Sequence, residues 1–192
     1  MTRGLLDPRP NRATIADMKL ARPLIFAVTL AYAESPPPPD STVAQDALLE
    51  QARALPNGRD AREISNRLWE LWAKAPNEAA QALLDRGMAA RAVLNFVDAK
   101  ESFDKLVSYC PDYAEGYNQR AFVSFLREDY AAALIDLDLA LERSPKHLAA
   151  MSGKALTLMG LGRHDEAQAI LREAVKLNPW IPEASLLQGE EL

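Results

Sequence analysis

The side chains that could do chemistry in this chain are few. The 192 residues contain one cysteine, Cys110, and two histidines, His147 and His164. One cysteine excludes an intrachain disulfide, and this set excludes a metal site rich in cysteine or histidine. Asp136 and Asp138 could form a pair of working carboxylates, but residues two apart on a helix do not face each other. The sequence therefore offers no obvious catalytic cluster.

Each of these groups also has a plain structural interpretation. Cys110 is either a reactive thiol, able to form an intermolecular disulfide in an oxidising compartment, or a small apolar residue that is partly buried. His147 and His164 are expected at the surface or capping helices. No G-x-S-x-G, P-loop, G-x-G-x-x-G or H-E-x-x-H motif occurs in the sequence. We therefore predict a protein that is not an enzyme and that holds no cofactor or metal.

The composition indicates a folded helical protein. Hydrophobic residues make up 48 % of the chain and charged residues 26 %, and only 8 residues are glycine. Alanine and leucine are abundant, and these residues have the highest helix propensity. At this length the chain can form one domain with a sizeable core.

The first residues differ from this pattern. Lys19 and Arg22 precede an apolar run of 11 residues that ends at Ala33, and Ala31 and Ala33 form an A-x-A pair. This layout predicts a secretory signal peptide over 1–33, with Met18 as a possible working start. The run is shorter than the roughly 20 residues of a membrane span. An N-terminal anchor or a buried helix is the alternative, and with a signal peptide we expect export across an inner membrane to the periplasm.

Cleavage after Ala33 would make the protein more acidic. It removes five basic and two acidic residues, which leaves 17 basic and 25 acidic residues and a net charge of −8. Such a charge disfavours nucleic acid and anionic lipid as partners. The segment 34–42 contains four consecutive prolines, which favour an extended spacer or a ligand for a proline-binding groove.

A 34-residue period organises the rest of the chain. Pro111, Pro145 and Pro179 are 34 residues apart, and a proline inside a helix costs a hydrogen bond and clashes with the preceding turn. Each proline therefore marks a boundary between helices. Turns at Asn95, Glu128 and Gly162 divide each unit again. The predicted helices are 80–93, 96–109, 114–127, 130–143, 148–161 and 164–177.

Small and large apolar residues keep the same step, as repeat architectures require. The repeated positions are Leu83, Tyr117 and Met151; Gly87, Ala121 and Ala155; Ala99, Ala133 and Ala167; Phe103, Leu137 and Leu171; and Leu106, Ala140 and Ala174. With the three prolines, this pattern over 80–179 resembles the tetratricopeptide repeat. The resemblance implies an all-α, right-handed superhelical stack of antiparallel helix hairpins, with units at 80–113, 114–147 and 148–181. It departs from the family where Ala90, Ser124 and Leu158 replace a tyrosine.

The flanking segments are less regular. Residues 43–77 resemble a degenerate fourth unit, with Pro76 one residue out of register, or else form an unrelated helical hairpin; either would cap the stack. Residues 182–192 are too few for a hairpin, so we expect a short terminal cap over the last apolar face, because an open solenoid end exposes core residues.

The resemblance also implies a concave groove lined by the first helix of each unit. The groove positions are Gln81, Leu84, Asp85, Met88, Arg91, Glu115, Asn118, Gln119, Phe122, Phe125, Ser152, Leu156 and Met159. Some family members bind a carboxylate terminus through Lys, Asn and Arg at such positions. Apolar residues occupy many of them here, so that property is not implied, and an apolar peptide or amphipathic helix suits the groove better.

Two hypotheses on function follow. The first is an interaction module, adaptor or scaffold, that binds a protein or peptide partner in this groove. The second is a structural subunit of an envelope assembly that associates with itself through its helical ends or through exposed Trp69 and Trp72. The groove could also be filled by the protein's own side chains or tail.

Overall fold

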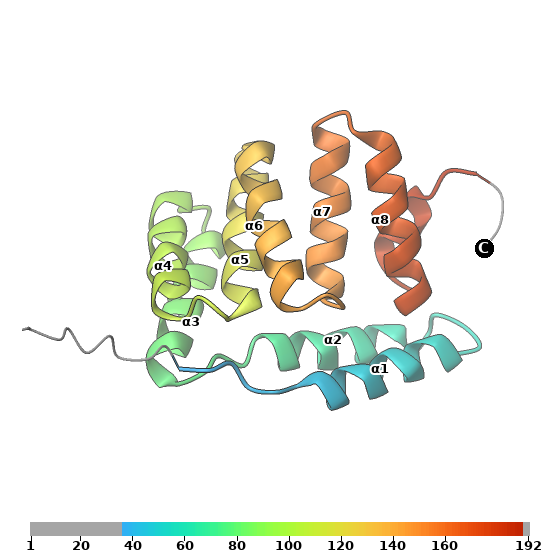
Figure 1. The fold of residues 1–192 in the computed structure, drawn as a ribbon, viewed down its shortest axis with the longest axis horizontal. Helices are drawn as coiled ribbons and strands as arrows, with labels where there is room; N and C mark the ends of the chain where they lie inside the picture. The colour runs from blue at the N-terminus through green and yellow to red at the C-terminus, as the bar shows by residue number, and fades with distance from the viewer. Residues whose placement is uncertain (1–35, 190–192) are drawn as a thin grey trace, which may run out of the picture. The chain divides into compact units, whose positions relative to one another are not determined.

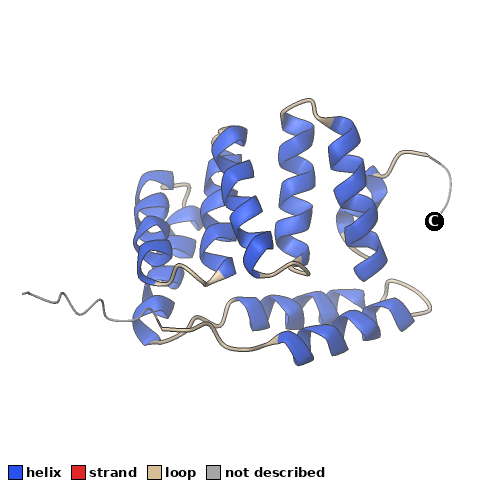
Figure 2. Ribbon diagram, viewed as in Figure 1, coloured by secondary structure: helices blue, strands red, loops and turns tan. Residues whose placement is uncertain are grey.

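Helices form all the regular secondary structure of residues 36–189, the part of the chain that the computed structural model describes (Figure 2). No strand occurs in this range, so the predicted all-α class is confirmed. The elements are α1 (Thr42–Ala54), α2 (Ala61–Trp72), α3 (Glu78–Ala92), α4 (Phe96–Tyr109), α5 (Ala114–Leu126), α6 (Tyr130–Arg143), α7 (Leu148–Gly160), α8 (His164–Leu177) and the 3-10 helix η1 (Pro182–Leu186). The predicted signal peptide lies outside the described residues.

Six of these helices, α3 to α8, form three antiparallel hairpins that stand side by side in chain order (Figure 1). Five of them begin at the predicted residue. The exception is α3, which begins at Glu78, because the side chain of Asn77 accepts a hydrogen bond from the backbone N–H of Ala80 at 2.9 Å. Such an N-cap satisfies a backbone donor that the first helical turn leaves free.

The turn inside each hairpin has the same backbone conformation. Leu94 and Glu128 have φ of 60°, and Gly162 has φ of 72°. These residues are 34 positions apart and all lie in the left-handed region, where only glycine avoids a steric penalty. The repeat therefore imposes the turn even where leucine or glutamate must adopt it.

The close contacts inside the hairpins explain the small residues of the repeat. A Cβ atom added to Gly87 of α3 would lie 2.4 Å from the ring of Phe103 on α4. Ala99, Ala121 and Ala133 are each completely buried, as Phe103 is. Paired helices approach closely at these positions, and the large residues fill the space beside them.

Pro111 lies in a turn that the next hairpin holds in place. The carbonyl oxygen of Pro111 accepts a hydrogen bond from the hydroxyl of Tyr117 at 3.1 Å and another from Nε of Arg143. The guanidinium of Arg143 also lies 4.4 Å from the centre of the Tyr117 ring. One unit thus fixes the end of the unit before it.

The N-terminal hairpin, α1 and α2, does not extend this stack. It runs across the ends of the other helices, beneath α5 to α8 in the view of Figure 1. Its apolar residues Leu49, Leu68 and Trp72 share a core with Met151 of α7 and Val175 of α8. Residues 43–77 thus form a helical hairpin, one of the two expected alternatives, but not a further repeat stacked in line with α3.

Polar and aromatic contacts fix this crossing position along its whole length. The Trp72 ring stacks on His147, with ring centres 4.1 Å apart. The Tyr113 hydroxyl donates to the carbonyl oxygen of Trp72 at 2.6 Å. The pKa of this hydroxyl is raised, mainly by its burial. At the other end, Nε1 of Trp180 donates to the carbonyl oxygen of Ala52 at 3.0 Å. The hairpin is thus attached to both halves of the stack.

After α8, the described residues continue in a short segment that packs on this helix. The carboxamide of Gln168 on α8 donates to the carbonyl oxygen of Leu186 at 3.0 Å and accepts from the backbone N–H of Gln188 at 2.8 Å. The 3-10 helix η1 contacts α8 beside these bonds. This segment lies where we expected a terminal cap.

Candidate functional site

A cavity of about 410 Å³ lies between α2 and the inner helices of the stack. Its walls come from α2, α3, α5, α7 and the segment around η1. Cavities of this size accommodate a few side chains or a small ligand. The site therefore combines the expected concave face with a wall that the crossing hairpin supplies.

Part of the predicted groove lines this cavity. The shared residues are Arg91, Asn118, Gln119, Phe122, Phe125, Ser152 and Leu156. They come from three different repeats, so the stack brings together side chains that are up to 65 positions apart in the sequence.

The other predicted residues do not line it. Leu84 is completely buried in the core around Phe103, and Glu115 is buried beside α2, so neither can reach a partner. Leu84 is enclosed by Phe103 and other side chains of the stack, whereas α2 covers the first turn of α5 at Glu115. Gln81, Asp85 and Met88 on α3 and Met159 on α7 also lie outside the cavity lining.

Several lining residues were not among the predicted ones. Ser65, Leu68, Trp69 and Trp72 of α2 form one wall, and Ile181, Pro182 and Glu183 form another. Trp72 was expected to be exposed, but its stacking on His147 leaves it 8 % exposed. The signal in the sequence that could have identified this wall is the pair of tryptophans, which are three residues apart on a helix and therefore share one face.

Two large aromatic side chains face solvent at this cavity. Trp69 is 43 % exposed and Phe122 is 44 % exposed, and both line it. The guanidinium of Arg91 lies 4.6 Å from the centre of the Phe122 ring and donates to the amide oxygen of Gln119. Burial lowers the pKa of Arg91, and the charge of Glu115 opposes this effect. The mouth of the cavity is thus aromatic, with one cation beside it.

A buried polar cluster supports the floor of the cavity. The Glu115 carboxylate accepts hydrogen bonds from the amides of Asn118, at 2.9 Å, and Gln119. Nε2 of His147 lies 2.9 Å from the same carboxylate, and Nδ1 of His147 accepts from the N–H of Ala150 at 3.3 Å. With Nδ1 accepting, Nε2 is the ring nitrogen that donates to Glu115. These bonds fix the orientation of the Asn118 and Gln119 amides.

His147 therefore caps α7, as one of its interpretations foresaw, but it is buried rather than at the surface. Cys110 is also buried, and burial raises the pKa of its thiol. Residues 36–189 contain no group of three or more His, Cys, Asp or Glu side chains placed to hold a metal ion. No described helix has the length and apolar character of a membrane span.

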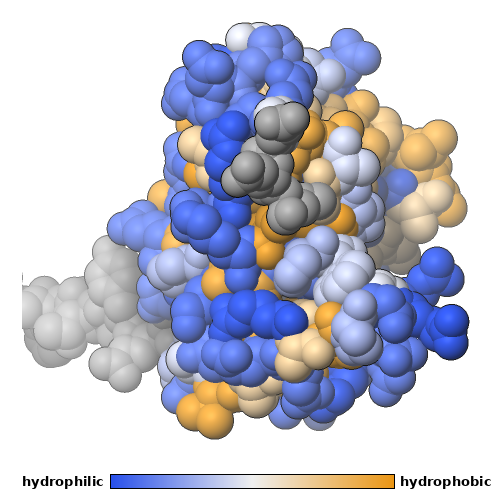
Figure 3. Space-filling model, turned by 90° about the vertical axis from the view of Figure 1, so that its right-hand side faces the viewer, coloured by the Kyte–Doolittle hydropathy of each residue, from blue (hydrophilic) through white to orange (hydrophobic). Residues whose placement is uncertain are grey.

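Two buried polar atoms of the cavity lining have no hydrogen-bond partner within the described residues. They are Oγ1 of Thr157 and Nδ2 of Asn178. A buried polar group without a partner costs about 1 to 3 kcal/mol. Figure 3, which looks onto the α8 side, shows hydrophobic surface bordered by hydrophilic residues.

The fold and this concave site define the class of protein, an α-solenoid of stacked helix hairpins. Within that class, residues 124–189 match the family model of the tetratricopeptide repeat. The chain is 26 % identical over 117 residues to a TPR repeat-containing protein of Rhizobium etli. It is 31 % identical over 119 residues to the Hsp70/Hsp90 co-chaperone cns1 of Schizosaccharomyces pombe. Over residues 124–189 the chain is thus similar to tetratricopeptide repeats.

The matches cover parts of these proteins. They span 61 % of this chain and 57 % of the Rhizobium protein, and 60 % of this chain and 33 % of cns1. Among solved structures, the TPR2B domain of yeast Sti1 in complex with pHsp70 superposes with a TM-score of 0.54 at 18 % identity, over 57 % of this chain and 90 % of that domain. The likeness to the Sti1 domain concerns the fold alone.

Proposed function

We propose that this protein is a non-catalytic interaction module that binds a peptide or an amphipathic helix of a partner protein in the cavity. The observation that carries the proposal is the exposure of Trp69 and Phe122 at its mouth. Aromatic residues of this kind supply most of the binding energy in many protein interfaces. An interior of Leu148, Leu156 and Ile181 would receive the apolar side chains of the partner.

The polar lining sets the kind of segment that fits. Asn118 and Gln119 are held by Glu115, and Ser152 donates to Glu183 at 3.0 Å. Their amide and hydroxyl groups suit backbone or side-chain polar groups of a bound segment. Arg91 is the one basic side chain of the lining, and its guanidinium already lies over Phe122. Recognition would thus depend on apolar contact more than on charge.

The similarity to known proteins supports the same class of function. The cns1 relative is a co-chaperone of Hsp70 and Hsp90, and the Sti1 domain was solved with pHsp70. These names support peptide binding as a property of the shared fold. The partner of this chain would be recognised mainly by apolar contact, as the cavity lining indicates. We also propose that the protein acts in the periplasm, on the basis of the apolar segment before Ala33.

The proposal can be tested in two steps. A protein starting at Glu34 is immobilised, and partners are captured from an envelope extract and identified by mass spectrometry. Affinity for the purified partner is then measured by calorimetry with Phe122→Ala. We expect binding about tenfold weaker or more, because a central aromatic contact is lost.

Ile135→Ala is the matched control. Ile135 is 63 % exposed on α6 and does not line the cavity, so its removal should leave the affinity unchanged. Unchanged binding by Phe122→Ala would contradict the proposal. A melting temperature that collapses in Phe122→Ala would instead place this ring in the core. Light scattering of the unliganded protein tests the alternative of self-association.

A further inference from the structure

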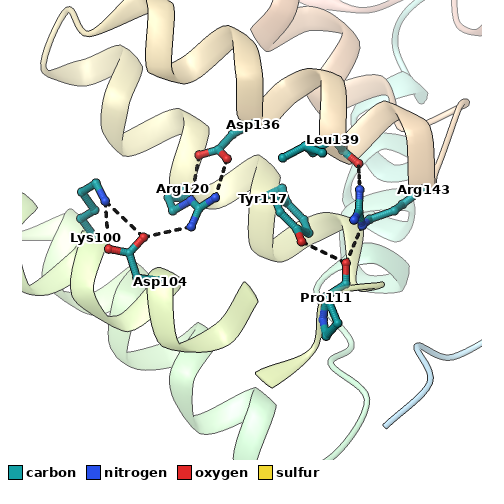
Figure 4. Close-up of polar contacts among 8 residues, drawn as sticks. All are labelled: Lys100, Asp104, Pro111, Tyr117, Arg120, Asp136, Leu139 and Arg143. Atoms are coloured by element: carbon teal, nitrogen blue, oxygen red, sulfur yellow. Dashed lines mark hydrogen bonds and ion pairs between the residues drawn. The ribbon is translucent and has the colours of Figure 1, made fainter. Parts of the chain in front are cut away.

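Neighbouring repeats are joined by an ion pair that recurs along the stack. On α5, Arg120 donates to Asp104 of the preceding α4 at 3.0 Å and to Asp136 of α6 (Figure 4). One repeat later, Lys154 of α7 pairs with Asp138 of the preceding α6 at 2.6 Å. Both members of the pair shift by 34 positions. The inner helices α5 and α7 thus each present a cation to a carboxylate on the repeat before them.

Buried positions lie on either side of each of these cations along its helix. Gly116 on α5 lies against Leu106 and Val107 of α4, at 3.3 and 3.2 Å from its built Cβ position. Val123, one turn beyond Arg120, is completely buried. On α7 the corresponding Ala150 and Thr157 are also completely buried. The face around the cation is therefore an interface between repeats.

Within residues 36–189, the same face of α3 has no repeat in front of it. It consists of Ala82, Leu83, Arg86 and Ala89, which correspond to positions on the inter-repeat face of α5 and α7, together with Val93 directly after α3, and we call it the open face. Ala82, Arg86, Ala89 and Val93 are exposed, Val93 by 75 %. The side chain of Arg86 has no ion pair or hydrogen bond within residues 36–189. The open face exists because α1 and α2 lie across the stack instead of ahead of α3.

An acidic group within range of the Arg86 charge is already engaged. Glu101 on α4 accepts from Lys105 at 2.7 Å, and this hydrogen bond and the charge of Lys105 lower the pKa of Glu101, with a smaller effect from Arg86. Arg86 therefore keeps a free charge at the position where Arg120 and Lys154 are paired. Val97, which is 72 % exposed on α4, extends the apolar area beside the open face.

We propose that the open face docks an amphipathic helix of a partner protein that presents a carboxylate to Arg86 between large apolar side chains. The arrangement would be the one in which α4 lies on α5. This surface is separate from the cavity, so the inference does not rest on the function proposed above. Its basis is charge complementarity, since both inner helices with a repeat in front place an acidic residue against the cation.

A second copy of this chain is a poor occupant of the open face. In head-to-tail stacking, α8 would meet α3, but α8 carries Arg172 at the position that Asp104 and Asp138 hold on α4 and α6. The segment after α8 is also held against it through Gln168. In face-to-face contact, Arg86 of each copy would oppose Arg86 of the other. Like charges at an interface are costly, so an acidic helix of a different protein is favoured.

A peptide copy of α4 is the probe. It consists of residues 95–109, acetylated and amidated, and keeps the Asn95 cap and Asp104. A lactam between the side chains of Glu101 and Lys105, which already touch and face solvent, holds it helical. The full chain, labelled with ¹⁵N, is titrated with this peptide and followed by NMR. We expect shifts of the amides between 82 and 93.

Charge reversal decides the result. The Arg86→Glu variant should bind the peptide about tenfold more weakly or worse. A peptide with Asp104→Lys should regain affinity for this variant, because the charges again have opposite sign. The Phe122→Ala variant should bind the peptide with the same affinity as the unchanged chain. This result would separate the open face from the cavity. Shifts located in the cavity, equal binding by Arg86→Glu, or no shifts with the lactam-held helix would each overturn the proposal.

Discussion

The stack α3–α8 and the hairpin α1–α2 are both helical pairs, but they are held in different ways. In the stack, the contacts recur every 34 residues, as in the pairs Arg120 with Asp104 and Lys154 with Asp138. The hairpin is held by contacts that occur once, such as the Trp72 ring on His147 and the Trp180 indole on the Ala52 carbonyl. Periodic contacts make a surface that can be extended, whereas single contacts fix one position.

The difference has a consequence for function. Because the hairpin crosses the stack, it covers part of the concave side with Trp69 and Trp72 and leaves the face of α3 open. A regular fourth repeat would have covered α3 and left the concave side wider. One change in the position of two helices thus sets the shape of both candidate binding surfaces.

The largest effect is expected inside the stack. Phe103→Ala should lower the free energy of unfolding by about 3 to 5 kcal/mol, because this ring is completely buried against Gly87 and leaves a cavity. Urea unfolding followed by circular dichroism measures the change. Val97→Ala on the same helix is the control, with a change below about 0.5 kcal/mol, since Val97 is exposed. Similar losses in both variants would contradict the assigned core.

The next effect should separate the two regions. Trp72→Ala should cost about 3 kcal/mol, because the ring loses its stacking on His147 and its bond from Nε1 to Gln45 at 2.7 Å. The hairpin should open while the stack remains folded. Hydrogen exchange should then show faster exchange in α1 and α2 and unchanged protection in α4 and α5.

Trp69→Ala provides the comparison on the same helix. This side chain is 43 % exposed, so its removal should cost well under half as much and leave the protection of α1 unchanged. If Trp72→Ala instead unfolds α3–α6 together with the hairpin, the two regions form one cooperative unit, and their distinction has no thermodynamic basis.

Most of the stack could be predicted from the sequence, and the hairpin could not. The proline and alanine positions specify local pairs, since a helix meets its neighbour within one repeat length. The hairpin depends on residues as distant as Ala52 and Trp180, 128 positions apart, and no period connects them. The site shows the same limit. Phe122 and Leu156 follow from the repeat, whereas the wall that includes Trp69 and the burial of Glu115 follow from the position of α2.

The ion pairs between repeats give a smaller effect that sharpens the comparison of covered and open faces. Arg120→Ala should lower the free energy of unfolding by about 2 kcal/mol, because the mostly buried carboxylate of Asp136 loses its charged donor. The pKa of the Arg120 guanidinium is raised, and its hydrogen bonds to Asp136 are the largest cause. Arg86→Ala should change stability by less than about 0.5 kcal/mol, since Arg86 is exposed. Equal losses would mean that the open face is covered.

The smallest effect concerns Cys110, which lies in the core around Phe103. Burial raises the pKa of its thiol in the folded protein above the unfolded value of about 8.5. Below that value both states are neutral and the thiol makes no difference to stability. As the pH rises through it, the unfolded state ionises first, so stability falls with pH. Comparing unfolding with Cys110→Ala between pH 7.5 and 9.5 isolates this contribution, since other groups titrate alike in both proteins.

Iodoacetamide should also label the folded thiol far more slowly than the unfolded one, because the thiolate is the reactive form. If Trp72→Ala leaves this labelling slow, the core around Cys110 is independent of the hairpin; fast labelling would show that the hairpin protects it.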